Sequence, residues 1–385
     1  MNELIAIGPR RYAVRGKLAI AGSLHDGAVV VEDDVIIDVT RSDRDGQLPR
    51  TVIDGAIIAP GFVDLQVNGG FGYEVEANAT SLKAIESRLP QSGVTSYLPT
   101  VISSPIDFYR RLLDHWEEEG DPGGARRIGL HLEGPFLSPA RKGAHPIDAI
   151  TAAGDDVFEL FMQSFEVALV TLAPEVAGNL DRIKQLRDAE VTVSLGHTNA
   201  TVDQLRMGVD AGATMATHLY NAMSPFNHRD PGVIGAVLVE DRLTAGLIAD
   251  GIHAHAAAID LAVRAKGVER IALVTDMMAA AGMPPGNYTL GGQSVTTDGR
   301  SVRLPDGTLA GSVLLMDQAI RNVAQWASLG PAQAIRMATE VPANLIHRDD
   351  IGRLRPGAVA DLVVLDANLR VQRTIIDGFT AFSAS

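Results

Sequence analysis

Residues 131–145 read HLEGPFLSPARKGAH, and this stretch holds the features that decide the predicted fold. It continues an apolar run that begins at Ile128, and a carboxylate, Glu133, is followed at once by Gly134 and Pro135. Short apolar runs are typical of buried strands, and a Gly-Pro pair ends a strand and turns the chain. Glu133 is therefore predicted at the carboxyl end of a buried strand. Enzymes built on parallel sheets place their reactive groups at such ends.

Two histidines occupy positions of the same kind. The apolar segment 191–195 runs through Gly196 into His197, and segment 213–217 runs directly into His218. One Glu and two His at separate strand ends offer three N and O ligands, a set that suits catalytic zinc with its fourth position open to water. The chain contains no cysteine, so thiolate ligands and disulfides are excluded. We therefore predict a metal site on these three residues.

The pattern along the chain predicts eight strands that mostly alternate with amphipathic helices. The strands are expected at residues 61–67, 94–99, 128–132, 167–172, 191–195, 213–217, 244–249 and 271–275. The helices are expected at residues 81–89, 104–119, 178–189, 201–211 and 255–266. This order predicts an α/β fold of the (β/α)8 TIM-barrel type, with an open doubly wound sheet as the alternative. The count of eight, with polar residues at so many strand ends, favours the closed barrel.

The two ends of the chain predict a second, smaller domain. Further strands are expected at residues 11–20, 28–31, 35–39, 357–366 and 371–376. We expect residues 1–57 and 348–385 to pair in a small β-sandwich, with a metal-dependent catalytic barrel, residues 58–347, inserted between them. Within the barrel segment, residues 282–311 predict a β-hairpin excursion, and two helices are expected at 313–327 and 331–346.

Composition narrows the range of partners. The formal net charge of −14 argues against nucleic acid and anionic membranes. The sequence contains no run near the roughly 18 apolar residues of a membrane span, and its first residues do not resemble a signal peptide. We expect a cytoplasmic protein. The net charge is compatible with a small anionic substrate only if a few cations are placed locally.

Further candidate residues follow other strands. Asp276 comes directly after the eighth strand, where a carboxylate can act as a general base, although an N-cap or an ion-pair partner would also fit. The polar loop 221–232 contains Asn221, a backbone N–H near Ala222, and Arg229, which together could hold a phosphate or carboxylate. His253, after the seventh strand, is a similar candidate. A solvated loop with a surface Arg is the alternative.

With these residues in view, the chain closely resembles the N-acetylglucosamine-6-phosphate deacetylase family of the amidohydrolase superfamily. The segments that carry the resemblance are PGFVD at 60–64, HLEGPF at 131–136, KGAH at 142–145, GHT at 196–198, THLYNAM at 217–223, DGIH at 250–253, TD at 275–276 and LAGS at 309–312. HLEGPF and THLYNAM are specific to the deacetylases, whereas PGAVADL at 356–362 is shared across the superfamily.

The resemblance implies one divalent metal per subunit, zinc first, with iron, cobalt or manganese as alternatives. Glu133, His197 and His218 would hold it. Asp276 would be the catalytic acid and base, and His145 would contact the acetamido carbonyl or a sugar hydroxyl.

The resemblance also implies a phosphate site and an assembly. Asn221, the Ala222 backbone and His253 would bind the sugar phosphate. Arg229 would reach that phosphate across a homodimer interface, so that one subunit completes the pocket of its neighbour.

The first strand departs from a common superfamily pattern. Many amidohydrolases carry His-x-His there to hold a second metal, whereas this chain has Gln66 and Asn68 at the two positions. Amides are poor metal ligands beside imidazole, so we predict one tightly held ion.

The expected reaction is hydrolysis of the acetamide of N-acetyl-D-glucosamine 6-phosphate to D-glucosamine 6-phosphate and acetate, in amino-sugar metabolism. An N-acetylgalactosamine-6-phosphate deacetylase, a dihydroorotase-like enzyme, an N-acyl-amino-acid hydrolase and a non-catalytic barrel are the alternatives. The phosphate-binding residues argue against the second and third of these, and the intact ligand set argues against the last. The choice of sugar epimer stays open.

Overall fold

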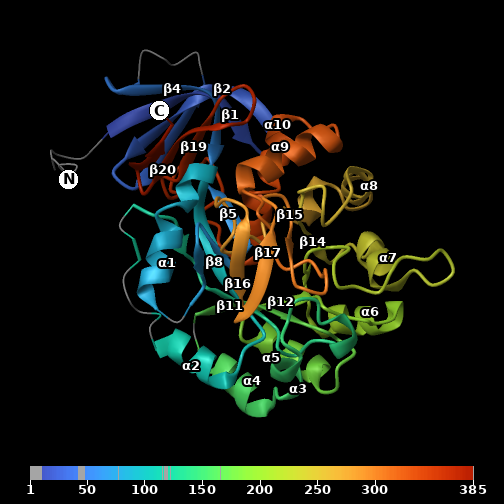
Figure 1. Ribbon diagram of the computed structural model, residues 1–385. Helices are drawn as coiled ribbons and strands as arrows, with labels where there is room; N and C mark the ends of the chain where they lie inside the picture. Colours follow the sequence, from blue (N-terminus) through green and yellow to red (C-terminus); the bar gives the residue numbers. More distant parts are fainter. Residues whose placement is uncertain are drawn as a thin grey trace.

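The computed structural model describes residues 11–41, 48–76, 78–114, 116, 120–121, 123–164 and 166–384. Figure 1 shows a barrel surrounded by helices, with a separate sheet at one end of the molecule. Part of the end of the helix predicted at 104–119, and parts of the predicted small domain, lie outside the described residues.

Eight parallel strands form the barrel sheet, in the order in which they occur in the chain. They are β5 (Phe62–Val67), β8 (Val94–Ile102), β10 (Leu130–Glu133), β11 (Val167–Leu172), β12 (Thr192–Leu195), β13 (Met215–Ala216), β14 (Thr244–Leu247) and β15 (Ile271–Leu273). The barrel closes between the segment just after β15 and the end of β5. There the Asp276 N–H donates to Gln66 O at 2.9 Å, and the Asn68 N–H donates to Met277 O at 2.8 Å. The predicted barrel is confirmed.

The second barrel strand is longer than predicted. All nine residues of β8 are buried, as expected for a strand covered on both faces. The sequence suggested an end at Pro99, but the strand continues to Ile102. The ladder between β5 and β8 shifts register between Asp64 and Val67, and this irregularity accommodates a residue that has no N–H to donate. The extension brings Ile102 to the mouth of the barrel.

The predicted amphipathic helices are present, with small differences at their ends. They are α1 (Ala79–Glu86), α2 (Ile106–Asp114), α5 (Asn179–Asp188), α6 (Val202–Ala211), α8 (Ala256–Lys266) and α9 (Met316–Trp326). Three further helices were not predicted: α3 (Ile147–Thr151), α4 (Asp155–Met162) and α7 (Gly232–Val239). The sequence of α7, GVIGAVLV, is apolar throughout, and so short an apolar run carries no readable helical period.

The single helix predicted at 331–346 was wrong. The segment forms α10 (Pro331–Arg336) and α11 (Glu340–Leu345), with Thr339 out of helical conformation at φ −132° and ψ −88°. Two causes are visible. Pro342 has no N–H for a continuous helix, and the barrel uses the carbonyls at the break, since Leu273 N–H donates to Met337 O and Val63 N–H to Ala338 O, both at 2.8 Å.

The two ends of the chain pair in one seven-stranded mixed sheet. Its strands are β1 (Arg11–Ile20), β2 (Ser23–Glu32), β3 (Val35–Arg41), β4 (Val52–Pro60), β19 (Leu362–Leu365), β20 (Val371–Ile376) and β21 (Phe379–Ser383), in the order β21-β20-β19-β4-β1-β2-β3. Side chains from six of these strands share one apolar cluster with residues of the segment before β19. The predicted pairing is confirmed, while the domain boundaries at residues 57/58 and 347/348 stay a prediction.

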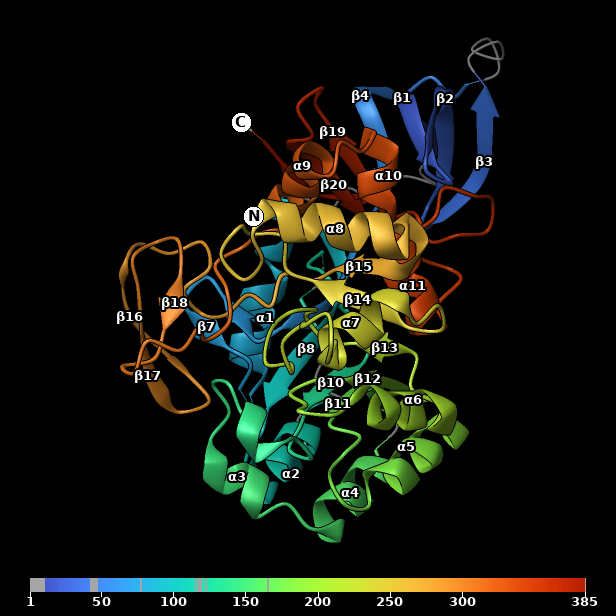
Figure 2. The ribbon, with the colours of Figure 1, turned by 90° about the vertical axis from the view of Figure 1, so that its right-hand side faces the viewer.

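The predicted hairpin excursion is a small antiparallel sheet. It contains β16 (Gly286–Leu290), β17 (Gln293–Thr297) and β18 (Val302–Arg303). Figure 2 shows it at one side of the barrel, beside β7 (Tyr73–Glu74). The Gly291 N–H donates to the Glu74 side chain at 3.0 Å, which fixes the hairpin turn to the loop after β5.

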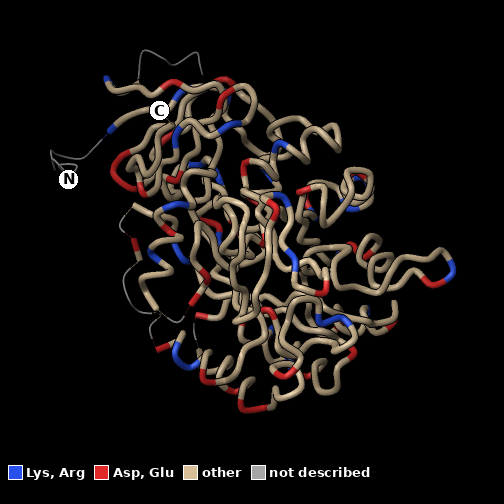
Figure 3. The backbone as a smooth tube through the Cα atoms, viewed as in Figure 1, with Lys and Arg blue, Asp and Glu red and all other residues tan. Residues whose placement is uncertain are grey.

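Charged residues of both signs are spread over the molecule. Figure 3 shows Lys and Arg interspersed with Asp and Glu over the part of the chain that is described. Among the described helices, none has the length and apolar character needed to cross a bilayer.

Candidate active site

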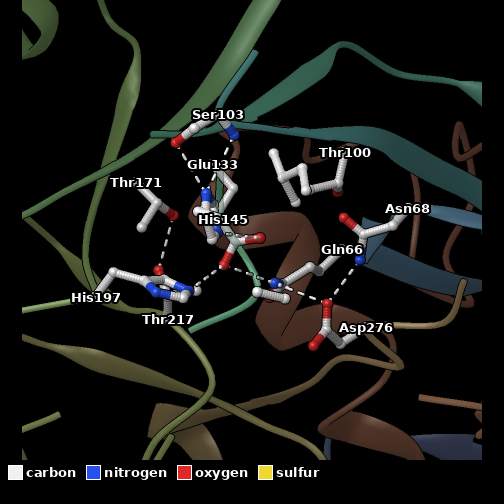
Figure 4. Close-up of polar contacts among 12 residues, drawn as sticks. Gln66, Asn68, Thr100, Ser103, Glu133, His145, Thr171, His197, Thr217 and Asp276 are labelled. Carbon is white, nitrogen blue, oxygen red and sulfur yellow. Dashed lines mark hydrogen bonds and ion pairs between the residues drawn. The ribbon is translucent and has the colours of Figure 1, made fainter. Parts of the chain in front are cut away.

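Polar side chains from six barrel strands converge on one cavity at the carboxyl ends of the strands. The cavity has a volume of about 330 Å³. Nine of the residues predicted to form the site line it: Asn68, Glu133, His145, His197, His218, Asn221, Ala222, His253 and Asp276. Gln66 lies between Glu133 and Asp276 and contacts both (Figure 4). The structure therefore brings together residues that are up to about two hundred positions apart in the chain.

Glu133, His197 and His218 form a compact buried group. Glu133 Oε1 lies 3.2 Å from His197 Nε2 and 2.9 Å from His218 Nε2, and the two Nε2 atoms are 3.1 Å apart. Ligands of a tetrahedral metal with bonds of about 2.0–2.1 Å are about 3.3 Å from one another. The three atoms thus have the spacing of a metal-binding set.

Two members of this group, His197 and Glu133, offer donor atoms to a cation. His197 Nδ1 lies 2.8 Å from the Arg141 carbonyl and must donate to it, so its Nε2 keeps a lone pair for a metal. Although burial opposes ionisation, contacts with His197 and His218 hold the pKa of Glu133 well below its usual value. A carboxylate and an imidazole lone pair pointing to one position are the donors that zinc, iron, cobalt or manganese would bind.

Asp276 faces this group from the last barrel strand. Its Oδ1 accepts from Asn68 Nδ2 at 2.7 Å and from Gln66 Nε2 at 3.1 Å. Burial, together with the negative charge of Glu133, raises the pKa of Asp276 to about 6. A carboxylate with a pKa close to neutrality can both accept and return a proton, so Asp276 has the properties of a general acid and base.

His145 lies beside Glu133 in the same cavity. Its Nδ1 accepts from the Ser103 N–H at 3.1 Å and lies 2.8 Å from Ser103 Oγ. Burial and the neighbouring His197 keep the pKa of His145 well below its usual value, so the ring is neutral. Because Nδ1 accepts, Nε2 carries the proton, and it lies 3.8 Å from Glu133 Oε2. His145 therefore offers a hydrogen-bond donor to the cavity.

The two amides at the degenerate second-metal position act as donors. Gln66 Nε2 contacts Glu133 Oε1 at 3.2 Å as well as Asp276, and Asn68 contacts Asp276. Since carboxylates only accept, the amide nitrogens must face them. Gln66 and Asn68 thus present N–H groups towards the site, where His-x-His would present lone pairs.

Asn221, Ala222 and His253 line the part of the cavity formed by the sixth and seventh strands. The His253 ring donates through Nδ1 to Asp250 at 2.7 Å, so its Nε2 is the atom left for a ligand. The Asn221 side chain lies 3.2 Å from the carbonyls of His218 and Leu219, which anchors it beside a metal-ligand candidate.

Arg229 is the one predicted site residue that lies apart. It is exposed on the loop before α7, a loop that projects from the body of the molecule (Figure 1), and it is not found among the described residues that line the cavity. Within a single chain, therefore, Arg229 does not complete the site.

Three groups of the site were missed by the sequence analysis. Ser103 orients His145, the Arg141 carbonyl orients His197, and the apolar pair Ile102 and Leu290 lines the cavity. Ser103 directly follows β8, but that strand was predicted to end at Pro99, so the position of Ser103 carried no signal. A backbone carbonyl and two ordinary aliphatic side chains give none.

Comparison with known proteins extends these observations. Residues 57–380 match the model of the Amidohydrolase family. The chain belongs to the amidohydrolase family.

Several amidohydrolases resemble this chain over most of its length. It is 37% identical over 382 residues to N-acetylglucosamine-6-phosphate deacetylase from Bacillus subtilis, covering 93% of this chain and 96% of that one. It is 38% identical over 377 residues to N-acetylgalactosamine-6-phosphate deacetylase from Escherichia coli O157:H7, covering 94% and 97%. A mutant N-acetyl-D-glucosamine-6-phosphate deacetylase from Mycobacterium smegmatis, solved in complex with N-acetyl-D-glucosamine-6-phosphate, superposes with a TM-score of 0.91 at 30% identity, covering 97% and 100%.

Proposed function

We propose that this amidohydrolase removes the acetyl group from N-acetyl-D-glucosamine 6-phosphate, giving D-glucosamine 6-phosphate and acetate. The observation that carries the proposal is the convergence of Asp276 and His145 with the Glu133, His197 and His218 group on one cavity. The names of the similar deacetylases supply the substrate.

The three ligand candidates are proposed to hold one zinc ion, with iron, cobalt or manganese as alternatives that accept the same donors. When bound, the ion activates water and polarises the amide carbonyl. Gln66 and Asn68 present N–H groups where a second ion would need lone pairs, so the proposal is for one ion per subunit.

The remaining steps belong to the side chains. Asp276 accepts a proton from the water that attacks the acetamide carbon. The Nε2–H of His145 donates to the carbonyl oxygen as negative charge develops on it. Asp276 then returns the proton to the nitrogen as the C–N bond breaks, which releases the amine and leaves acetate. Asn68 and Gln66 hold Asp276 in place through Oδ1 during both transfers.

The sugar phosphate is proposed to lie against Asn221, the Ala222 backbone and His253. Arg229, exposed on its projecting loop, is proposed to reach the phosphate of the neighbouring subunit in a homodimer. Mixing subunits tests this arrangement. Arg229→Ala should weaken phosphate binding and Asp276→Asn should prevent turnover, yet a mixed dimer contains one site with both native residues.

We expect co-refolded Arg229→Ala and Asp276→Asn chains to regain up to about a quarter of the native rate, because half of the dimers in a random mixture are mixed and each contains one intact site. Each variant alone should stay at its low rate. A mixture that is no more active than the sum of its parts would show that Arg229 acts within its own subunit or not at all.

Acetate release is the experiment that tests the reaction. Zinc-loaded protein should release acetate from N-acetyl-D-glucosamine 6-phosphate and much less from unphosphorylated N-acetyl-D-glucosamine. Removal of the metal with a chelator should stop the release, and zinc should restore it. Metal-loaded protein that releases no acetate from the phosphorylated sugar would overturn the proposal.

The galacto epimer is a second candidate substrate. The Escherichia coli N-acetylgalactosamine-6-phosphate deacetylase is about as similar to this chain as the glucosamine enzymes are, at 38% against 37% for the Bacillus subtilis protein. The same assay with N-acetyl-D-galactosamine 6-phosphate decides between them through the ratio of the two kcat/KM values.

A further inference from the structure

A second cavity lies beside the candidate active site and shares a wall with it. Its volume is about 570 Å³, and it is bordered by the segment around β7, the start of α2 and the β16–β17 turn. Asn68, Ile102 and Leu290 line both cavities. These three side chains therefore stand between the two spaces.

The apolar part of this wall is firmly built. Ile102 is the last residue of β8 and Leu290 the last of β16, and they are 6% and 4% exposed. The chain at Gly291 passes so close to Ile102 that a Cβ there would lie 2.6 Å from Ile102 Cδ1. Gln293 Nε2 donates to the Ala144 carbonyl at 2.5 Å, which ties the hairpin turn to the segment that carries His145. Leu290 is thus held at a fixed place on the cavity rim.

The wall flanks His145, the proposed contact of the acyl carbonyl. Ile102 directly precedes Ser103, which hydrogen-bonds the His145 ring, and Ala144 directly precedes His145 itself. Ile102, Ala144 and Leu290 belong to one apolar cluster. Apart from Asn68, the wall next to His145 is therefore apolar, in contrast to the Asn221 and His253 side of the cavity.

The topology of the barrel sets the direction of the acyl group. An amide is planar and trans, so the carbon chain of the acyl group points away from the sugar that carries the nitrogen. The sugar phosphate is proposed at residues that follow β13 and β14, the sixth and seventh strands of the sheet, whereas Ile102 ends β8, the second. The second and sixth strands of an eight-stranded barrel lie opposite each other. An acyl chain on a sugar held in that way would point towards Ile102 and Leu290.

We propose that Ile102 and Leu290 limit the length of the acyl group, and that they make the site selective for acetyl over propionyl and butyryl groups. The second cavity is the space that a longer acyl chain would enter if the wall were cut back. This inference rests on the proposed deacetylase function and names the residues that determine its acyl specificity.

The test measures kcat/KM for the N-acetyl, N-propionyl and N-butyryl derivatives of glucosamine 6-phosphate. Leu290→Ala should raise the ratio of butyryl to acetyl hydrolysis by at least about tenfold over the native ratio, since one or two methylenes in an apolar pocket are worth that much. Leu304→Ala is the matched control. Leu304 is 8% exposed in the same apolar cluster but is not among the described residues lining either cavity, so its loss should leave the ratio unchanged.

A second variant covers the case in which Leu290→Ala does not fold. Ile102→Val removes one methyl group and should raise the propionyl to acetyl ratio by several-fold. Folded variants that release acetate with the native acyl preference would overturn the inference while leaving the proposed reaction intact. Native protein that hydrolyses none of the three amides would instead overturn the proposed function.

Discussion

The key residues of the site sit on strained backbone. His197, His218 and Asp276 have φ values of +48°, +27° and +51°, in a region that non-glycine residues seldom adopt. Each such residue costs on the order of 1–3 kcal/mol and persists because its neighbours hold it. Asp276 is held on both sides, since its N–H donates to Gln66 O and its carbonyl accepts from the Ser312 N–H at 2.8 Å. The left-handed turns aim three side chains from separate strands at one point.

This strain decides how the role of Asp276 is best tested. Asn keeps the shape of Asp and tolerates positive φ, so Asp276→Asn should preserve the backbone. We expect it to lower kcat by about 10²–10⁴-fold, the usual contribution of a general acid and base, while zinc content stays at the native level. Steady-state kinetics measures the change in kcat, and metal analysis measures the zinc content. A near-native rate would refute the assigned role.

Asp64 provides a prediction about pH. It is fully buried behind the site, accepts from Thr275 Oγ1 at 2.6 Å, and burial raises its pKa from 3.8 to about 7. Because the pKa is raised in the folded state, protonated Asp64 stabilises the fold fully at low pH, and that stabilisation is lost as the pH rises towards 7.

Replacing Asp64 by Asn should remove this dependence. Between about pH 4 and 7, the free energy of unfolding of the native protein should fall relative to Asp64→Asn by up to about 1.4 kcal/mol per pH unit. Urea unfolding of both proteins at several pH values, with equal metal loading, measures the difference. The same pH dependence in both proteins would show that Asp64 does not titrate in this range.

Sequence patterns predicted the site residues that lie at the ends of strands. They did not predict the residues that line the site from elsewhere in the chain. Glu133, His197, His218 and Asp276 each follow an apolar run, which places them on one rim of the barrel. Leu290 could not be found in this way, because nothing in an exposed hairpin sequence reveals where its turn docks. Leu290 is buried in an apolar cluster that includes Ile102, which lies 188 positions earlier in the chain.

At the scale of elements, the passage from the small sheet into the barrel is sterically tight. Gly61 lies between β4 and β5, and a Cβ there would meet the Thr95 side chain at 2.1 Å. Gly61→Ala should lower the free energy of unfolding by about 1–3 kcal/mol, as overpacked interiors do. Gly286→Ala is the control, since its nearest neighbour would be a Tyr288 ring atom at 3.8 Å. The midpoints of urea unfolding are measured for both variants. Equal midpoints would argue against steric crowding at Gly61.

Elements were predictable where one periodicity dominates. The helix at 201–211 was correct to within one residue, because α6 has a complete capping box between Thr201 and Gln204. The segment 331–346 looked equally helical, yet barrel strands take the carbonyls of Met337 and Ala338. Competition of this kind comes from tertiary structure and leaves no mark on local sequence.

At the scale of the whole molecule, Arg126 joins the barrel to the small sheet. It lies on β9 (Arg126–Arg127), next to β8, and its guanidinium contacts Asp361 and Asp377, the latter at 2.6 Å. Asp361 is 2% exposed, so loss of its partner would leave a buried charge. Arg126→Met should therefore cost at least about 2 kcal/mol of stability.

The double variant Arg126→Met with Asp361→Asn should recover most of that loss, because no buried charge is then left unpaired. Lys184→Met is the control. It breaks an ion pair with Asp181 whose side chains are 53% and 76% exposed, and it should change stability by less than about 1 kcal/mol. Chemical unfolding of the four proteins measures all of these effects, and an unrescued double variant would contradict the explanation.

The architecture was predictable from the order of elements, because alternating strands and helices close into few folds. The way in which the two ends meet was predictable only in outline. β4 was not among the expected strands, yet it lies at the centre of the small sheet, between β1 and β19. Its sequence, VIDGAIIAP, is as compatible with an irregular connection that leads into the barrel as it is with a strand.

The position of β4 has a consequence for synthesis on the ribosome. Its partner β19 begins at Leu362, about three hundred residues later, which takes about 15–60 s to translate. Throughout that interval the growing chain exposes the unpaired edge of a largely apolar strand, the kind of edge that recruits other chains. The strands that cover this edge are among the last residues to emerge from the ribosome. Premature termination near the end of translation would therefore release a complete barrel with an exposed, aggregation-prone strand edge.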